Sequence, residues 1–225
     1  MRSKSRNISE GTSRIEAFSD GVFAIAITLL VLDIHVPELK DGESLTRALL
    51  SKWETYLAFL IGFFTLLVCW INHHYMFEYI SGKNDALLLL NGFKLLVVSF
   101  TPFATALLSK YIGTANQQLT ISIYACNFFL MGTAMTCMWV YAVRSGLVVH
   151  RSEKILKAAT RLYIFASLFS GAIFIMSFIS IPVSLGMFGI MFLIFVYPKD
   201  RIRRLAGKGN RHAEEKELKL VSSNM

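Results

Sequence analysis

Three side chains that can carry charge or form hydrogen bonds stand at the entrance of an apolar segment. Arg14, Ser19 and Asp20 precede residues 22–32, which are almost entirely apolar. Ionisable groups at the edge of a membrane span are costly to bury and usually serve a function. At 100° per residue, Asp20 lies about 140° around the helix from Ile25. We therefore expect its carboxylate to point into the protein, where it needs a polar partner.

The second apolar segment ends in four residues that share one helical face through i, i+3, i+4, i+7 spacing: Trp70, His73, His74 and Phe77. If the first helix runs outward and the second returns, this face lies at the same depth as Asp20. We expect a polar cluster there, made of Arg14, Ser19, Asp20, Trp70 and His73 or His74. Two roles stay open for this cluster. It holds the two helices in register as a hydrogen-bonded clamp, or it takes part in gating or in pH sensing through histidine.

Catalysis and metal binding are alternative uses of the same residues. A membrane-embedded enzyme would use Ser19, Asp20 and His74, but no oxyanion hole or base can be argued from the sequence. Adjacent histidines diverge on a helix, unlike an i, i+4 pair, and no further ligand lies at metal spacing nearby. We expect no catalytic residue, no metal site and no cofactor. A non-conducting scaffold with a purely structural cluster is a further alternative.

The composition indicates that membrane-spanning helices position these residues. The chain has 225 residues, of which 54% are hydrophobic, and its mean hydropathy is +0.52. These values are typical of an all-α polytopic membrane protein. We predict six spans, with five as the main alternative because a short turn at Pro182 separates the last two. The spans cover roughly residues 17–36, 54–77, 86–108, 118–143, 159–179 and 182–197.

The net charge of +8 suggests a nucleic-acid partner until the positions of the charges are considered. With the N-terminus inside, eighteen of the 23 lysines and arginines fall in inner segments. Lys94 lies within the third span, and the four in outer segments are Lys40, Arg47, Lys52 and Lys110. This asymmetry predicts a cell-membrane protein with both termini in the cytoplasm and no nucleic-acid partner. We divide the chain into a six-helix domain, residues 1–200, and a basic cytoplasmic tail, residues 201–225.

The first helix carries a mostly apolar stripe at helical spacing: Gly21, Ile25, Thr28, Leu29, Leu32 and Val36. Two interpretations compete. The stripe is ordinary helix packing, or copies of the helix surround an axis and their branched side chains form a hydrophobic constriction. At the outer end, Asp33 either forms a carboxylate ring that attracts cations or simply ends the helix at the interface.

The first two helices also carry family-specific motifs. Arg14, Phe18, Ser19 and Asp20 match R-x-x-x-F-S-D, and G-V-F-A-I-A-I-T-L-L-V-L-D follows directly. Trp70, His73 and His74 match W-x-x-H-H. In these residues and in its six spans, the chain resembles the bacterial form of the transmembrane protein 175 potassium-channel family, which has one six-helix unit per subunit.

The resemblance implies a passive, potassium-preferring channel without a carbonyl filter. It implies a homotetramer in membrane lipid, with four first helices lining the pore and K⁺ as the permeant ion. The narrow part would be Ile25, Leu29 and Leu32, with Thr28 as a polar layer relevant to ion preference. The motif residues that would position the pore helix are Arg14, Phe18, Ser19, Asp20, Trp70 and His73. The runner-up is a proton pathway that uses Asp20 and His73.

Overall fold

The computed structural model describes residues 3–39, 42–149 and 152–195. Every element in these ranges is helical, which confirms the all-α prediction. The elements are α1 (Ser3–Leu29), the 3₁₀-helix η1 (Leu30–Asp33), α2 (Leu45–Leu50), α3 (Trp53–Phe77), α4 (Asp85–Tyr111), α5 (Gln117–Arg144), α6 (Glu153–Ile179) and α7 (Ile181–Phe195). The basic tail predicted for residues 201–225 lies outside the described residues.

Five described helices are long and apolar enough to cross a bilayer: α1 with η1, α3, α4, α5 and α6. The sixth predicted span corresponds to α7, which has only 15 described residues. At 1.5 Å per residue, the described part of α7 is about 22 Å long, compared with ~30 Å for the hydrocarbon core, and residues 196 and 197 of the predicted span lie outside the described residues. The predicted break is present, since α6 ends at Ile179 and α7 begins at Ile181. Pro182 occupies the first turn of α7, where its missing N–H costs little.

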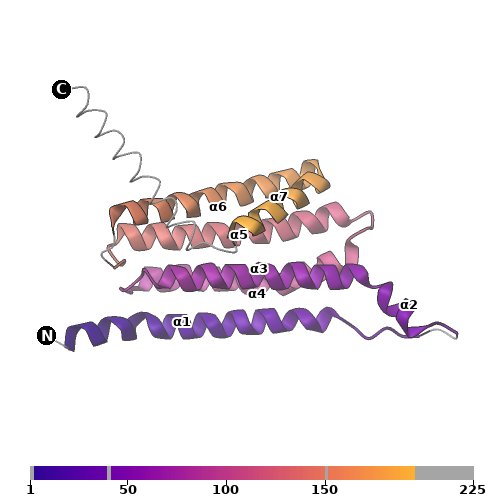
Figure 1. Cartoon of the computed structure of the whole chain (residues 1–225), viewed down its shortest axis with the longest axis horizontal. Coiled ribbons are helices and arrows are strands. Elements are labelled where there is room, and N and C mark those ends of the chain that lie inside the picture. Colours follow the sequence, from indigo (N-terminus) through magenta and orange to yellow (C-terminus); the bar gives the residue numbers. More distant parts are fainter. Residues whose placement is uncertain (1–2, 40–41, 150–151, 196–225) are drawn as a thin grey trace, which may run out of the picture.

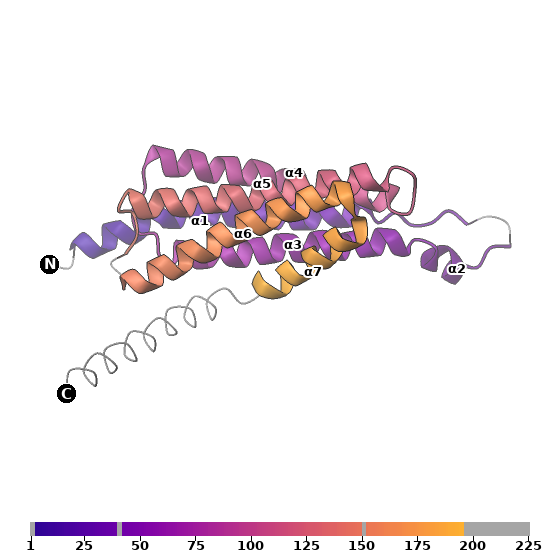
Figure 2. The same ribbon diagram turned by 90° about the horizontal axis from the view of Figure 1, so that it is seen from above.

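The helices form three layers (Figure 1). α1 lies along one side, α3 and α4 form the middle, and α5, α6 and α7 lie on the far side. Successive long helices run in opposite directions (Figure 2). The α3–α4 and α5–α6 connections therefore lie at the end where α1 begins, and the α4–α5 connection lies at the other end.

Local signals in the sequence explain several helix ends. Asn84 precedes α4, and its side-chain oxygen accepts a hydrogen bond from the Leu87 N–H at 3.0 Å, which caps the helix. Gly113 follows α4 and Gly146 follows α5, both with positive φ, a conformation that glycine adopts without steric cost.

The outer end of the first span differs from the prediction. We expected one helix over residues 17–36, but the α-helix ends at Leu29 and continues as 3₁₀-helix only to Asp33. In a 3₁₀-helix residues i and i+3 are eclipsed, so Leu32 stays on the face of Leu29. Val36 lies beyond the helical segment and does not belong to the stripe.

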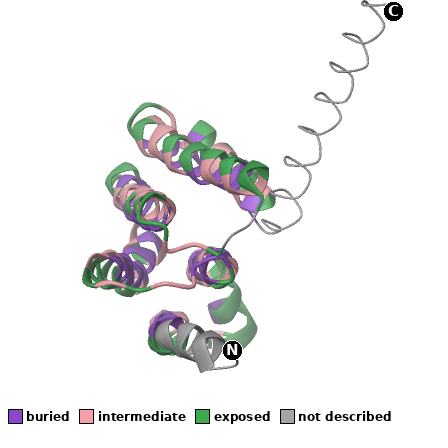
Figure 3. Cartoon of the chain, turned by 90° about the vertical axis from the view of Figure 1, so that its left-hand side faces the viewer, coloured by how far each residue is buried: buried purple, intermediate pink, exposed green. Residues whose placement is uncertain are grey.

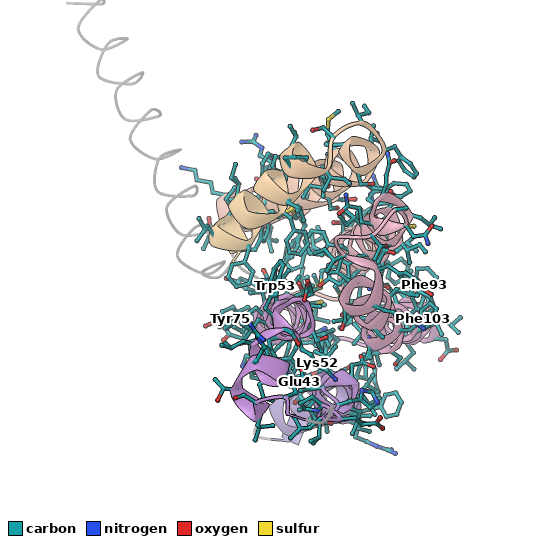
Figure 4. The ribbon with its side chains drawn as sticks, turned by 90° about the vertical axis from the view of Figure 1, so that its right-hand side faces the viewer. Glu43, Lys52, Trp53, Tyr75, Phe93 and Phe103 are labelled. Carbon is teal, nitrogen blue, oxygen red and sulfur yellow. The ribbon has the colours of Figure 1, made fainter. Side chains whose placement is uncertain are left out.

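One face of α1 packs against the middle layer. Phe23, Ala26 and Leu30 are buried there in a cluster that includes Leu66 of α3 and Val98 of α4. The view along the bundle in Figure 3 shows the same division, with buried residues facing neighbouring helices and exposed ones facing outward. The exposed outer side of α4 carries Phe93 and Phe103 (Figure 4). This outward apolar surface is expected of a protein surrounded by lipid or by other subunits.

α3 approaches its neighbours closely at Gly62. A Cβ built there would lie 2.7 Å from Thr105 Oγ1 of α4 and 3.1 Å from Leu30 Cδ2 of η1. Glycine thus allows α3 to seat against both segments, as small residues do between membrane helices.

Candidate functional site

The stripe predicted on α1 is the face that the subunit leaves uncovered. Ile25 is 62% exposed, Leu29 43% and Leu32 66%, while their neighbours on the opposite face are buried. Burial of Phe23, Ala26 and Leu30 against α3 and α4 fixes the rotation of α1 about its axis. An apolar face of this kind is available to lipid or to other copies of the chain.

Thr28 lies among these exposed residues and is the polar member of the face. Its Oγ1 is 3.0 Å from the Ala24 carbonyl oxygen and 2.9 Å from that of Ile25, so the hydroxyl donates to its own helix. The group therefore turns oxygen lone pairs outward. Oxygen atoms with free lone pairs can replace the water molecules that surround an alkali cation.

Asp20 is exposed and does not point into the protein as predicted, but its carboxylate has a partner on α3. The indole Nε1 of Trp70 donates to Asp20 Oδ1 at 2.8 Å, and the imidazole of His74 stacks on the indole with 5.8 Å between ring centroids. A hydrogen bond to an ionised carboxylate is stronger than a neutral one. The contact ties α1 to α3 where the first span begins.

Ser19 is fully buried and faces α4, not α3. Its hydroxyl lies 2.8 Å from the Ile15 carbonyl oxygen, to which it donates, and it accepts from Asn91 Nδ2 at 3.0 Å. Because its proton is donated to the backbone and its described side-chain partner is an amide, not a base, Ser19 is not arranged as a nucleophile. His74, the base of the enzyme alternative, is instead exposed and stacked on Trp70.

His73 meets an amine from the middle of α4. Lys94 is completely buried, and its Nζ lies 2.6 Å from His73 Nδ1. Which of the two nitrogens donates depends on the tautomer of the histidine. The same Nζ lies over the ring of Phe23 of α1, 4.7 Å from its centroid, in a cation–π contact. His73 and Lys94 thereby link α3 and α4 directly behind α1.

Arg14 and Phe18 lie outside these contacts. Both are exposed, Phe18 by 67%, and both border a groove of about 440 Å³ with Lys83 and Asn91. The cluster predicted for the first two helices thus divides into three contacts, Asp20–Trp70–His74, Ser19–Asn91 and His73–Lys94, and Arg14 joins none of them.

Asp33 borders a separate groove at the opposite end of the bundle. The groove also contains Lys52, Glu54 and Lys110, and Lys52, labelled in Figure 4, lies at the start of α3. Two lysines therefore accompany the carboxylate within the subunit. The His35 ring nitrogen Nδ1 is 3.0 Å from the Asp33 carbonyl oxygen, which holds this segment close to the end of η1.

Asn91 was not among the predicted site residues, and Lys94 was predicted only as a charge within the third span. Asn91 and Lys94 are spaced i, i+3 within an apolar helix, so they share a face of α4. Polar side chains at that spacing in a membrane span are a signal of interhelical contact. Among the residues that the structure describes, no three His, Cys, Asp or Glu side chains gather as they would around a metal ion.

The segment from α1 through most of α4 matches a known family. The family model for the endosomal/lysosomal potassium channel TMEM175 matches residues 14–102. A human protein named endosomal/lysosomal proton channel TMEM175 is 34% identical over 149 residues, which are 62% of this chain and 29% of that protein. The similarity to the longer animal protein is therefore partial.

Bacterial relatives match over nearly their whole length. A potassium channel of Chamaesiphon minutus is 40% identical over 190 residues, 83% of this chain and 92% of that protein. A potassium channel of Streptomyces collinus is 35% identical over 187 residues, which are 82% of this chain and 91% of that protein. The crystal structure of a lysosomal potassium-selective channel TMEM175 homolog from Chamaesiphon minutus superposes with a TM-score of 0.73, at 39% identity, and covers 85% of this chain and 97% of that one. The chain belongs to the TMEM175 family of ion channels.

Proposed function

We propose that four copies of the chain form a passive, potassium-preferring channel in which α1 lines the pore. The observation that carries the proposal is the uncovered face of α1, where Ile25, Leu29 and Leu32 are exposed while the opposite face is packed. A face of this type on each copy suits closed rotational symmetry around one axis. The bacterial relatives are named potassium channels, which supports K⁺ as the permeant ion.

The physical basis of gating would be a dry constriction. Rings of Ile25, Leu29 and Leu32 offer a cation no ligand, so a dehydrated ion meets a barrier there. Thr28, between Ile25 and Leu29 on the same exposed face, would supply a ring of oxygen atoms. On this view Asp20–Trp70 and His73–Lys94 are positioning contacts, which hold α1 against α3 and α4.

The channel would lie in the bacterial plasma membrane with the N-terminal end of α1 in the cytoplasm. The excess of lysine and arginine in the segments at that end supports this orientation. Exposed apolar side chains along all the long helices support contact with lipid.

Potassium flux from proteoliposomes tests the proposal. Ile25→Asn places a polar group in the constriction, and a barrier lower by about 1.4 kcal/mol raises the flux about tenfold. Leu168→Asn is the matched control, since Leu168 is also exposed but lies on α6, away from α1. We expect the control to conduct like the unaltered protein. Equal flux from all three proteins contradicts a pore lined by Ile25.

Proton conduction is the second candidate, because the animal relatives are named proton channels. The same vesicles, loaded with a pH-sensitive dye and free of potassium, separate the two ions. Proton flux without potassium flux overturns the potassium channel. Native mass spectrometry of the same preparation tests the assembly, for which we expect four subunits of 25.4 kDa.

A further inference from the structure

A partly open cavity lies on the opposite side of α3 from α1. It has a volume of about 70 Å³ and lies between α3, α5, α6 and α7. One water needs only ~10–15 Å³ by this measure, so the space is several times larger than a single-water site. The lining is mostly apolar and includes Met131 and Met135 of α5 and Phe188 and Met191 of α7.

One polar atom in this lining has no partner. Asn72 is 5% exposed, and its Nδ2 donates to the carbonyl oxygens of Val68 at 2.7 Å and of Phe195 at 3.1 Å. These two bonds fix which amide atom is nitrogen. Asn72 Oδ1 is buried and accepts no hydrogen bond from the described residues. A buried acceptor without a donor is destabilised by the loss of its hydration.

The cavity therefore combines a mostly apolar lining with one buried acceptor, Asn72 Oδ1, to which no described residue donates. A charged ligand is excluded because the lining offers it no counter-charge. Methionine side chains adapt their shape to small apolar molecules. The matching ligand is uncharged, a few carbon atoms long, and carries one donor.

We propose that this cavity binds small apolar alcohols, with the hydroxyl donating to Asn72 Oδ1 and the carbon chain against Met131, Met135 and Met191. The site is separate from the uncovered face of α1, and its binding does not depend on the proposed conduction. Within α3, Asn72 turns toward α7 while the adjacent His73 turns toward Lys94 of α4.

Methyl NMR of the full chain in detergent, with ¹³C-labelled methionine methyl groups, tests the site directly. Titration with 1-butanol is expected to shift the signals of Met131, Met135 and Met191 to saturation. Met76 and Met138 are fully buried outside the cavity and act as internal controls. The comparison ligand is methyl propyl ether, an isomer of 1-butanol without a donor. It is expected to bind about fivefold more weakly, as the loss of one hydrogen bond implies.

Variants separate the hydrogen bond from the apolar contacts. Asn72→Leu is expected to abolish the preference for the alcohol, whereas Asn127→Leu, at a buried asparagine of α5 outside the cavity, retains it. If Asn72→Leu does not fold, Ala166→Leu fills the cavity from α6 and is expected to abolish both titrations. Equal affinity for alcohol and ether in the unaltered protein overturns the proposal. Shifts that never saturate, or that affect Met76 and Met138 equally, also overturn it.

Discussion

Lys94 and His73 form a pair whose members depend on each other. Lys94 is completely buried in an apolar helix, and no carboxylate pairs with its Nζ within 4 Å among the described residues. His73 Nδ1 and the ring of Phe23 are the groups that meet it. Among the described residues, none is bonded to His73 Nε2, so the contact with Lys94 is the hydrogen bond that they offer the imidazole.

Removing one of the two side chains is therefore expected to lower the free energy of unfolding more than removing both. Lys94→Met leaves a buried imidazole without any partner and is expected to lower the free energy of unfolding by about 2 kcal/mol. Adding His73→Phe removes the unpaired group, and the double variant is expected to recover at least half of that loss. Thermal unfolding in detergent measures both.

Lys110→Met serves as the control for this pair, because Lys110 is exposed at the other end of α4 and its replacement is expected to change little. Additive losses in the double variant would mean that the two side chains do not depend on each other.

At the level of single residues, sequence patterns predicted some contacts better than others. The i, i+3, i+4 spacing on α3 indicated that Trp70 faces the first helix, and the structure has Trp70 bonded to Asp20. Ser19 was predicted in the cluster with Trp70 and a histidine, but it bonds to Asn91 of α4, and Lys94 was assigned no partner. Both contacts depend on how α4 is rotated against α1 and α3. Periodicity within one helix does not determine that rotation. The roles given to the site residues stay predictions.

Among the elements, hydropathy identified the long helices well, because each needs a continuous apolar run to cross a bilayer. It gave no sign of α2, which has six residues, or of the change from α-helix to 3₁₀-helix after Leu29. Leu30 of this segment is buried in a cluster with Leu66 of α3 and Val98 of α4, a tertiary contact that hydropathy along the sequence does not reveal.

Packing between elements is most sensitive at Gly62. Gly62→Ala places a methyl group against Thr105 and Leu30, and such overpacking is expected to lower the free energy of unfolding by about 2 kcal/mol. Gly186→Ala is the control, since a Cβ there meets no atom within 4 Å. Both are measured by thermal unfolding. A Gly62→Ala protein as stable as Gly186→Ala would mean that α3 and α4 move apart without cost.

For the whole molecule, the arrangement of charge predicts which end faces the cytoplasm. In a cysteine-free background, Ala115→Cys in the α4–α5 connection is expected to react with a membrane-impermeant maleimide on intact cells. Ser145→Cys, between α5 and α6, is expected to react only after lysis. Both residues are exposed, so access alone does not separate them. The reverse labelling pattern would invert the orientation.

The short stretch Trp70–His73 connects α3 to three other helices. Within one turn, Trp70 bonds to α1, Asn72 to α7 and His73 to α4. Rolling α3 about its own axis would break all three bonds at once, since they leave the helix in different directions. Because these bonds hold α3 to three other helices, we expect the four helices to move together at this end. We expect bending of α1 to occur instead at its other end, where the α-helix changes to the 3₁₀-helix η1.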